Sequence, residues 1–205
     1  MIDVDKNKVD IIYLLKSTET EGIENLIAYM DMSGFFESPC SGAYHLACEG
    51  GLAEHSLNVY RRMTRFVNAT DFPISRNSIV IVSLLHDLGK MGDHFKPNYV
   101  PNMVRSKTKN KDTGEYDMVQ SSAKPYETNK DLNYEEHEIR SVMIAERFIS
   151  LTEEEETAIL HHNGLWGKLD SAFSSTFDKH ELATLLHFAD LWCSRFEEVS
   201  ADDTN

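Results

Sequence analysis

Hydrophobic residues recur along most of the chain at the spacing of an α-helix. Ile23, Leu26, Ile27 and Met30 stand at positions i, i+3, i+4 and i+7, which places one apolar face on a helix. The segment 75–88 is apolar nearly all round, as a central buried helix should be. Similar patterns predict the other helices, near residues 11–15 and over 52–67, 135–150, 152–163 and 180–198.

Residues 92–133 interrupt this helical pattern. They contain three prolines and many polar residues. Within them, 103–109 and 115–120 flank Asn110-Lys111-Asp112-Thr113-Gly114, a composition typical of the turn in a β-hairpin. A long excursion of this kind usually covers a functional site or is disordered. The sequence therefore predicts an all-α fold, a helical bundle with a small β-hairpin insertion around residues 98–125.

Composition narrows the classes of partner. The chain has 205 residues, with 34 Asp and Glu against 20 Lys and Arg, and a net charge of −14. This length predicts a single domain over 1–205, and the acidic excess argues against stable binding of duplex nucleic acid. No apolar run approaches the roughly 18 residues of a membrane span, and no secretory signal is visible. Three cysteines without CxxC spacing form no disulfide framework, so we expect a cytoplasmic protein.

Histidines and carboxylates inside apolar segments are the candidate chemistry. His86-Asp87 follows Ser83-Leu84-Leu85, and an ionised aspartate in such a setting is costly unless a positive charge compensates it. A divalent metal would do so, with imidazole and carboxylate as ligands. Neighbouring residues of a helix point about a hundred degrees apart, so both side chains reach one ion only at a helix end or at a local distortion of the helix. Gly89 makes such an end plausible.

Each of these residues also has an ordinary structural interpretation when taken alone. A single histidine can cap a helix, and a helix aspartate can lie at the surface. Their combined order along the chain instead favours a metal site: His55, His86-Asp87, His137, the pair His161-His162 and Asp190.

Three motifs within this order resemble a known family. They are Gly50-Gly51-Leu52-Ala53-Glu54-His55-Ser56, Leu85-His86-Asp87-Leu88-Gly89-Lys90 and Leu186-His187-Phe188-Ala189-Asp190. The sequence resembles the HD superfamily of metal-dependent phosphohydrolases, most closely the small stand-alone hydrolases of bacteria and their phages. The resemblance covers residues 22–198, which we take as the core of a single HD domain, with 92–133 as its insertion.

The resemblance implies a set of metal ligands and a reaction. One ion would be held by His55, His86, Asp87 and Asp190. Members with two ions use further histidines, which here are His137 and one or both of His161 and His162, with Asp87 bridging the ions. The ions would be one or two of Mn, Fe, Co, Ni or Zn. The expected activity is phosphomonoesterase or phosphodiesterase action on a nucleotide or a similar small molecule, with Asp87 and Lys90 as catalytic residues.

Two cationic side chains are candidates for binding the substrate. Lys90 follows the metal dipeptide and could hold a phosphate oxygen, although a helix-end lysine is an equal alternative. Arg140 lies one turn beyond His137 and could bind phosphate through two parallel hydrogen bonds, or form a surface salt bridge. Trp166 and Phe173 are candidates for a pocket wall, and the polar tail 200–205 is expected to fray.

Other functions stay open at this point. The same site could serve a nuclease acting on short single-stranded ends. A non-catalytic nucleotide-sensing protein, or a di-iron enzyme of the wider superfamily, would also use such a fold. A homodimer is open too, because the pattern does not separate an apolar interface from the core.

Overall fold

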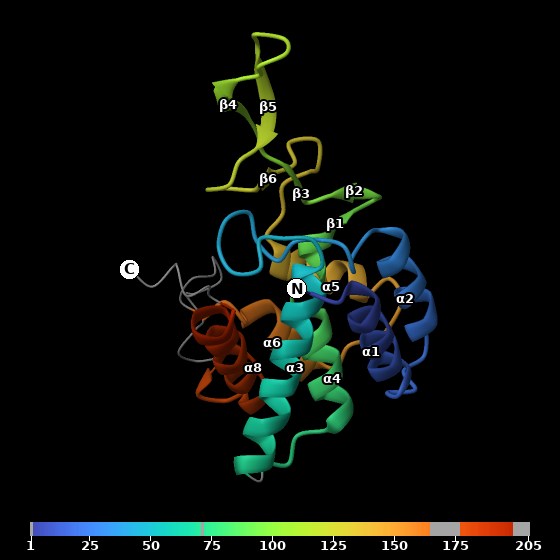
Figure 1. The fold of residues 1–205 in the computed structure, drawn as a ribbon. Helices are drawn as coiled ribbons and strands as arrows, with labels where there is room; N and C mark the ends of the chain where they lie inside the picture. Colours follow the sequence, from blue (N-terminus) through green and yellow to red (C-terminus); the bar gives the residue numbers. More distant parts are fainter. Residues whose placement is uncertain (1, 71, 165–176, 199–205) are drawn as a thin grey trace.

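Helices make up most of the computed structural model, which describes residues 2–70, 72–164 and 177–198 (Figure 1). The predicted pocket aromatics Trp166 and Phe173 and the tail 200–205 lie outside the described residues. Seven α-helices lie within them: α1 Val4–Lys16, α2 Ile23–Met32, α3 Gly51–Thr70, α4 Arg76–Leu85, α5 His137–Ala145, α6 Glu153–His161 and α8 Glu181–Trp192. The mostly helical fold predicted from the sequence is confirmed. No helix in the described ranges has both the length and the apolar character needed to cross a membrane.

Helix α4 lies at the centre of the hydrophobic core and packs against α1, α3, α6 and α8. Every residue from Ile79 to Leu85 is buried, as the apolar pattern predicted. Burying these seven residues on all sides removes their apolar side chains from water, which is the main favourable term in folding. The core also includes Ile11 and Leu15 of α1, which precede the range that the resemblance covers.

Helix α4 ends earlier than the pattern indicated. Its last residue is Leu85 and His86 is its C-cap. A short 3₁₀ helix, η1 Leu88–Met91, follows after Asp87. The chain therefore turns between His86 and Asp87, so of the two alternatives that the sequence left open the structure has the helix end.

The insertion consists of short antiparallel strand pairs. The predicted hairpin is present as β4 Met103–Lys109 and β5 Tyr116–Gln120, and it projects away from the helices (Figure 1). Two further pairs lie closer to the helices and were not predicted. They are β1 Gly92–Asp93 with β2 Lys96–Pro97, and β3 Tyr99–Pro101 with β6 Tyr126–Thr128.

Polar contacts attach the base of the insertion to the helical body. The Asp93 carboxylate accepts hydrogen bonds from Tyr29 Oη at 2.6 Å and from Arg147 Nη2 at 2.7 Å. The backbone N–H of Tyr126 donates to the carbonyl of Gly42 at 3.1 Å. These contacts fix the strand pairs nearest the helices and leave the β4–β5 hairpin exposed.

Gly89 allows η1 to pack directly on α5. A Cβ atom there would lie 2.3 Å from the carbonyl oxygen of His137 and 2.9 Å from Arg140 Cβ. The Gly89 N–H also donates to Ser141 Oγ at 2.8 Å. Its backbone is not left-handed, so the glycine is required for close approach and not, as the sequence suggested, to terminate α4.

We expect Gly89→Ala to destabilise the protein and to weaken metal binding. Inserting a methyl group into a tightly packed contact costs about 1–3 kcal/mol, and the resulting shift would move Lys90 and His137 apart. Denaturant unfolding and metal titration measure the two effects. Gly114→Ala is the control for metal binding, because a Cβ atom on that hairpin-turn glycine would meet no other atom within 4 Å. It should leave metal binding unchanged; a Gly89→Ala protein with normal stability and metal binding would contradict the packing argument.

Candidate metal centre

The turn after α4 brings two consecutive polar side chains into one buried space. The side chains of His86 and Asp87 are 0% and 1% exposed, and His86 Nε2 lies 3.5 Å from Asp87 Oδ2. In a continuing helix they would diverge, but here α4 has already ended at Leu85. The structure thus satisfies the geometric condition that the sequence set for a shared site.

The two oxygens of Asp87 face two different pairs of histidines. Oδ1 lies 3.2 Å from His137 Nε2 and 3.4 Å from His162 Nε2. Oδ2 lies 3.5 Å from the Nε2 atoms of both His55 and His86. Although buried, Oδ1 accepts no hydrogen bond from the described residues. A carboxylate arranged in this way has its two oxygens available to two separate cations.

Asp190 completes the side of the site that contains His55. Its Oδ1 lies 3.2 Å from His55 Nε2. The side chains of His55, His86 and Asp190 form one group of potential ligands, and those of His86, Asp87 and His162 form a second. Ligand atoms bound to one ion at about 2.0–2.2 Å lie roughly 3.0–3.5 Å apart, so these spacings fit divalent metal ions.

Hydrogen bonds orient the imidazole rings toward the site. Nδ1 of His86 bonds the carbonyl of Ser83 at 3.0 Å, and Nδ1 of His162 bonds that of Ile159 at 2.7 Å. When Nδ1 carries the proton, Nε2 has a lone pair to offer a metal. Each ring is therefore held by its own helix with Nε2 directed at Asp87.

His55 receives its orientation from a carboxylate instead. Its Nδ1 lies 2.9 Å from Glu198 Oε2, and Glu198 also accepts a hydrogen bond from Asn58 Nδ2 at 3.0 Å. Glu198 follows a π-helical turn, η4 Cys193–Glu197, at the end of α8. A carboxylate behind a ligating histidine raises the basicity of the ring.

Charges within the site favour a cation. Burial lowers the pKa of His86 to about 3, although Asp87 acts in the opposite direction, so this ring is neutral. Burial opposes ionisation of Asp87, but the Lys90 ammonium holds the pKa of its carboxyl well below the ordinary value. Lys90 Nζ lies 2.7 Å from Asp87 Oδ2. The site therefore combines imidazole nitrogens with an ionised carboxylate, the donor set that divalent transition metals prefer.

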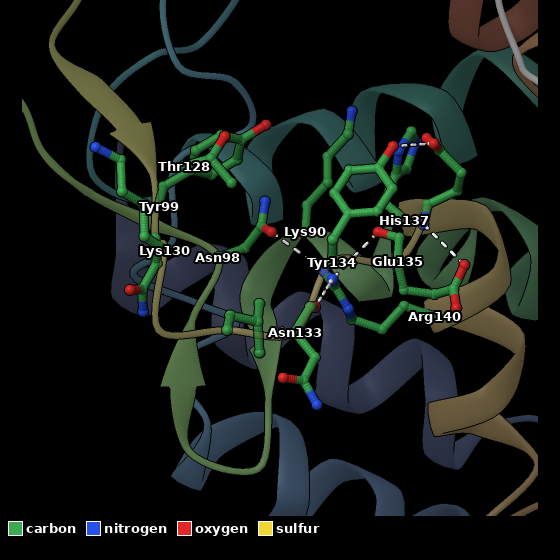
Figure 2. Close-up of a pocket in the computed structure, with 13 residues that line it drawn as sticks. Lys90, Asn98, Tyr99, Thr128, Lys130, Asn133, Tyr134, Glu135, His137 and Arg140 are labelled. Atoms are coloured by element: carbon green, nitrogen blue, oxygen red, sulfur yellow. Dashed lines mark hydrogen bonds between the residues drawn. The ribbon is translucent and has the colours of Figure 1, made fainter.

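Two pockets adjoin the site and share Lys90. The first, of about 640 Å³, lies between η1, α5 and the insertion and includes His137 (Figure 2). The second, of about 540 Å³, includes Asp190, His45 and Asn163. The first pocket thus contains His137, which lies next to Asp87 Oδ1. The second contains Asp190, which pairs with His55 on the side of Asp87 Oδ2. Both leave space for a ligand beside the two groups of potential metal ligands.

Of the adjacent pair His161-His162, the structure turns only one toward the site. His162 is the C-cap of α6 and is 1% exposed, with its ring at Asp87. His161 belongs to neither group of potential ligands. Burial and the neighbouring His180 lower the pKa of His161. The geometry therefore supports His162, rather than His161, as the ligand.

Arg140 has a different environment from the one that the sequence suggested. Its guanidinium is buried, and Nη1 donates to Gly89 O and Asn98 Oδ1, both at 3.0 Å. Nη2 donates to the carbonyls of Asn133 and Glu135, both at 3.1 Å (Figure 2). With the four Nη hydrogens engaged, the group joins η1, the insertion and α5. This geometry favours an anchoring role over phosphate binding.

We therefore expect Arg140→Lys to lower the free energy of unfolding by about 2 kcal/mol, because a lysine cannot replace these charged hydrogen bonds. Arg147→Lys is the matched control. Its guanidinium is more exposed and pairs with Asp93, so its loss should cost less than about 1 kcal/mol. Urea unfolding compares the two. Unchanged stability in Arg140→Lys, with a raised KM for a phosphate ester, would instead support direct substrate binding.

Three residues near the site were not among the predicted ligands: Cys40, His45 and Glu198. Cys40 and His45 reach it from the loop before α3. Their order along the chain carries no helical or motif signal. Glu198 could not be distinguished from Glu197, because the π-helical turn decides which of the two carboxylates meets His55.

Comparison with known protein families agrees with this geometry. The family model of the HD domain matches residues 52–192. No curated protein and no solved structure matches the chain. The matched range begins in α3, shortly before His55, and ends in α8, shortly after Asp190. It therefore includes every residue in the groups of potential ligands except Cys40 and His45, which lie in the loop before α3. The chain belongs to the HD superfamily of metal-dependent phosphohydrolases.

Proposed function

We propose that this chain hydrolyses a phosphate ester of a nucleotide or nucleotide-like small molecule at a centre for two divalent ions. The observation that carries the proposal is the Asp87 carboxylate, whose oxygens each face a separate pair of histidine Nε2 atoms. His55, His86 and Asp190 would hold one ion with Asp87 Oδ2. His137 and His162 would hold the other with Oδ1.

Bound divalent ions supply Lewis acidity, which neutralises charge on phosphoryl oxygens and makes hydroxide available near neutral pH. The residues of the chain orient the reaction. Lys90 carries its ammonium group beside Asp87 Oδ2 and lines both pockets. We infer that it holds a non-bridging oxygen of the phosphate, because an ammonium can donate to that oxygen while staying paired with Asp87.

The two pockets favour a diester over a monoester. A phosphodiester has a substituent on either side of phosphorus, whereas a monoester has one. The two pockets provide space beside both groups of potential ligands, and Lys90 lines both pockets. This arrangement suits a diester.

The first pocket supports a nucleotide as one substituent. Tyr99 and Tyr134 offer rings for stacking, and Asn98, Asn129 and Asn133 lie among its lining residues (Figure 2). Aromatic rings stack on any nucleobase, and amides can hydrogen-bond its edge. With a net charge of −14, an extended nucleic acid is a weaker candidate than a short nucleotide, although a short single-stranded end carries the same chemistry.

The first experiment is an assay of manganese-loaded protein with a chromogenic aryl phosphodiester and the matching monoester. We expect cleavage of the diester, and loss of turnover by at least about 100-fold with Asp87→Asn, because that change removes the charge both ions share. Metal content per chain should fall in parallel. Asp10→Asn is the control, since Asp10 pairs with Lys6 at the surface of α1 and lies outside the groups of potential ligands and both pockets. Cleavage that survives Asp87→Asn would refute the assignment.

Other outcomes distinguish the alternatives. Cleavage of the monoester alone would indicate a nucleotidase. Metal binding without turnover of either compound, or of short cyclic and linear oligonucleotides, would support a nucleotide-sensing protein or a di-iron enzyme.

Lys90→Gln should reduce kcat/KM by about 10- to 100-fold, or about 1.4–2.7 kcal/mol of transition-state stabilisation, with metal content retained. The reason is the loss of one charged contact to the phosphate. Lys96→Gln is the matched control, because Lys96 Nζ donates to Asp131 O and lines neither pocket. Steady-state kinetics and metal analysis test both variants. Loss of metal from Lys90→Gln would show instead that the lysine stabilises the folded site.

A further inference from the structure

A third group of potential ligands adjoins the centre on the side of His55. It consists of Cys40, His45 and His55. Cys40 Sγ lies 3.3 Å from His45 Nε2 and 4.0 Å from Asp87 Oδ2. Cys40 is 0% exposed and His45 is mostly buried. The group is thus contiguous with the proposed two-ion centre through Asp87 and His55.

The loop before α3 holds Cys40 and His45 on the same side. The N–H of Cys40 donates to the carbonyl of Leu46 at 3.1 Å. Ser41 Oγ donates to the carbonyl of His45 at 2.9 Å and accepts from the N–H of Tyr44 at the same distance. The loop thereby folds back on itself, and the two side chains meet although they are five positions apart in the sequence.

The separations match those of ligands around one ion. In a tetrahedral zinc site, with Zn–S near 2.3 Å and Zn–N near 2.0–2.1 Å, a sulfur and a nitrogen lie about 3.5 Å apart. Cys40 and His45 are at 3.3 Å. His55 and Asp87 are at 3.5 Å.

The other buried thiol of the chain provides the contrast. Cys193 is 0% exposed, like Cys40. Its Sγ donates to Glu197 Oε2 at 3.6 Å, and it belongs to none of the groups of potential ligands found in the described part of the chain. Burial therefore does not by itself place a cysteine among metal-binding groups; the loop before α3 does so for Cys40.

We propose that Cys40 is a thiolate ligand of the ion on the His55 side of the centre, with His45 as a neighbouring nitrogen donor. The inference rests on the proposed two-ion centre and deepens it. The half of the centre formed by His137, His162 and Asp87 Oδ1 offers nitrogen and oxygen only. The half with Cys40 adds sulfur, so it selects zinc or cobalt over manganese or magnesium, because thiolate favours the softer cations. The two halves therefore differ in metal preference.

The test uses cobalt as the probe. The protein is titrated with Co²⁺ under reducing conditions, and its absorption is recorded in the visible and near-ultraviolet. Visible ligand-field bands report that Co²⁺ is bound at all. A near-ultraviolet sulfur-to-cobalt charge-transfer band reports a thiolate ligand, and nitrogen and oxygen ligands do not produce it. X-ray absorption of the zinc-loaded wild-type protein gives an independent readout, a sulfur scatterer at about 2.3 Å.

Cys40→Ser and Cys193→Ser are compared with the wild type. We expect the charge-transfer band to vanish in Cys40→Ser and to persist in Cys193→Ser. The preference for zinc over manganese, measured by competition, should fall at least about tenfold in Cys40→Ser alone. If Cys40→Ser does not fold, the X-ray absorption of the wild type decides the question.

The outcomes separate this proposal from the one on which it rests. Visible bands without a charge-transfer band, or zinc without a sulfur neighbour, would overturn the thiolate and leave the two-ion centre standing. A charge-transfer band that is lost in Cys193→Ser and retained in Cys40→Ser would also overturn it. Absence of any bound Co²⁺ or zinc would overturn both.

Discussion

The structure depends on one ionised carboxylate in the middle of an apolar helical core. Asp87 is 1% exposed at the end of a helix whose last seven residues are buried. An unpaired charge in such surroundings would cost several kcal/mol. The chain compensates it with the Lys90 ammonium and with imidazole rings from α3, α5 and the ends of α4 and α6. The close contact of η1 with α5 and the Arg140 hydrogen bonds position these groups.

Assembly of the centre therefore requires the whole fold. His55 and Asp190 are 135 positions apart in the sequence, and both meet next to Asp87. Such a site does not exist in an unfolded chain, so any ion that binds it stabilises the native state by mass action. The apo protein should accordingly be the less stable form. The cation and the surrounding apolar helices together offset the free energy needed to gather so many polar groups.

Sequence patterns predicted the parts that depend on local order. Helical spacing located the main helices, and the apolar stretch before His86-Asp87 indicated both the burial of this pair and the need for a helix end. The rest depends on contacts between distant segments. Strand pairs β1–β2 and β3–β6 are two or three residues long, too short for an alternating pattern. The partners of Arg140 include three backbone carbonyls, which no residue type reveals. Cys40 lies in a loop, where spacing has no fixed geometric meaning.

The π-helical turn η4 has an evolutionary consequence. A π turn is closed by a hydrogen bond between residues i and i+5, whereas an α turn joins i and i+4. It therefore contains one residue more and can arise from a single-residue insertion in a helix. In this chain Glu198, which follows the turn, supports His55, while Glu197 pairs with Arg62 at the surface. Deleting one codon within 193–196 would return the turn to an α-helix and leave Glu198 in its place behind His55. The chain could therefore lose a residue here and keep the carboxylate behind this histidine, with no substitution in the HD motifs themselves.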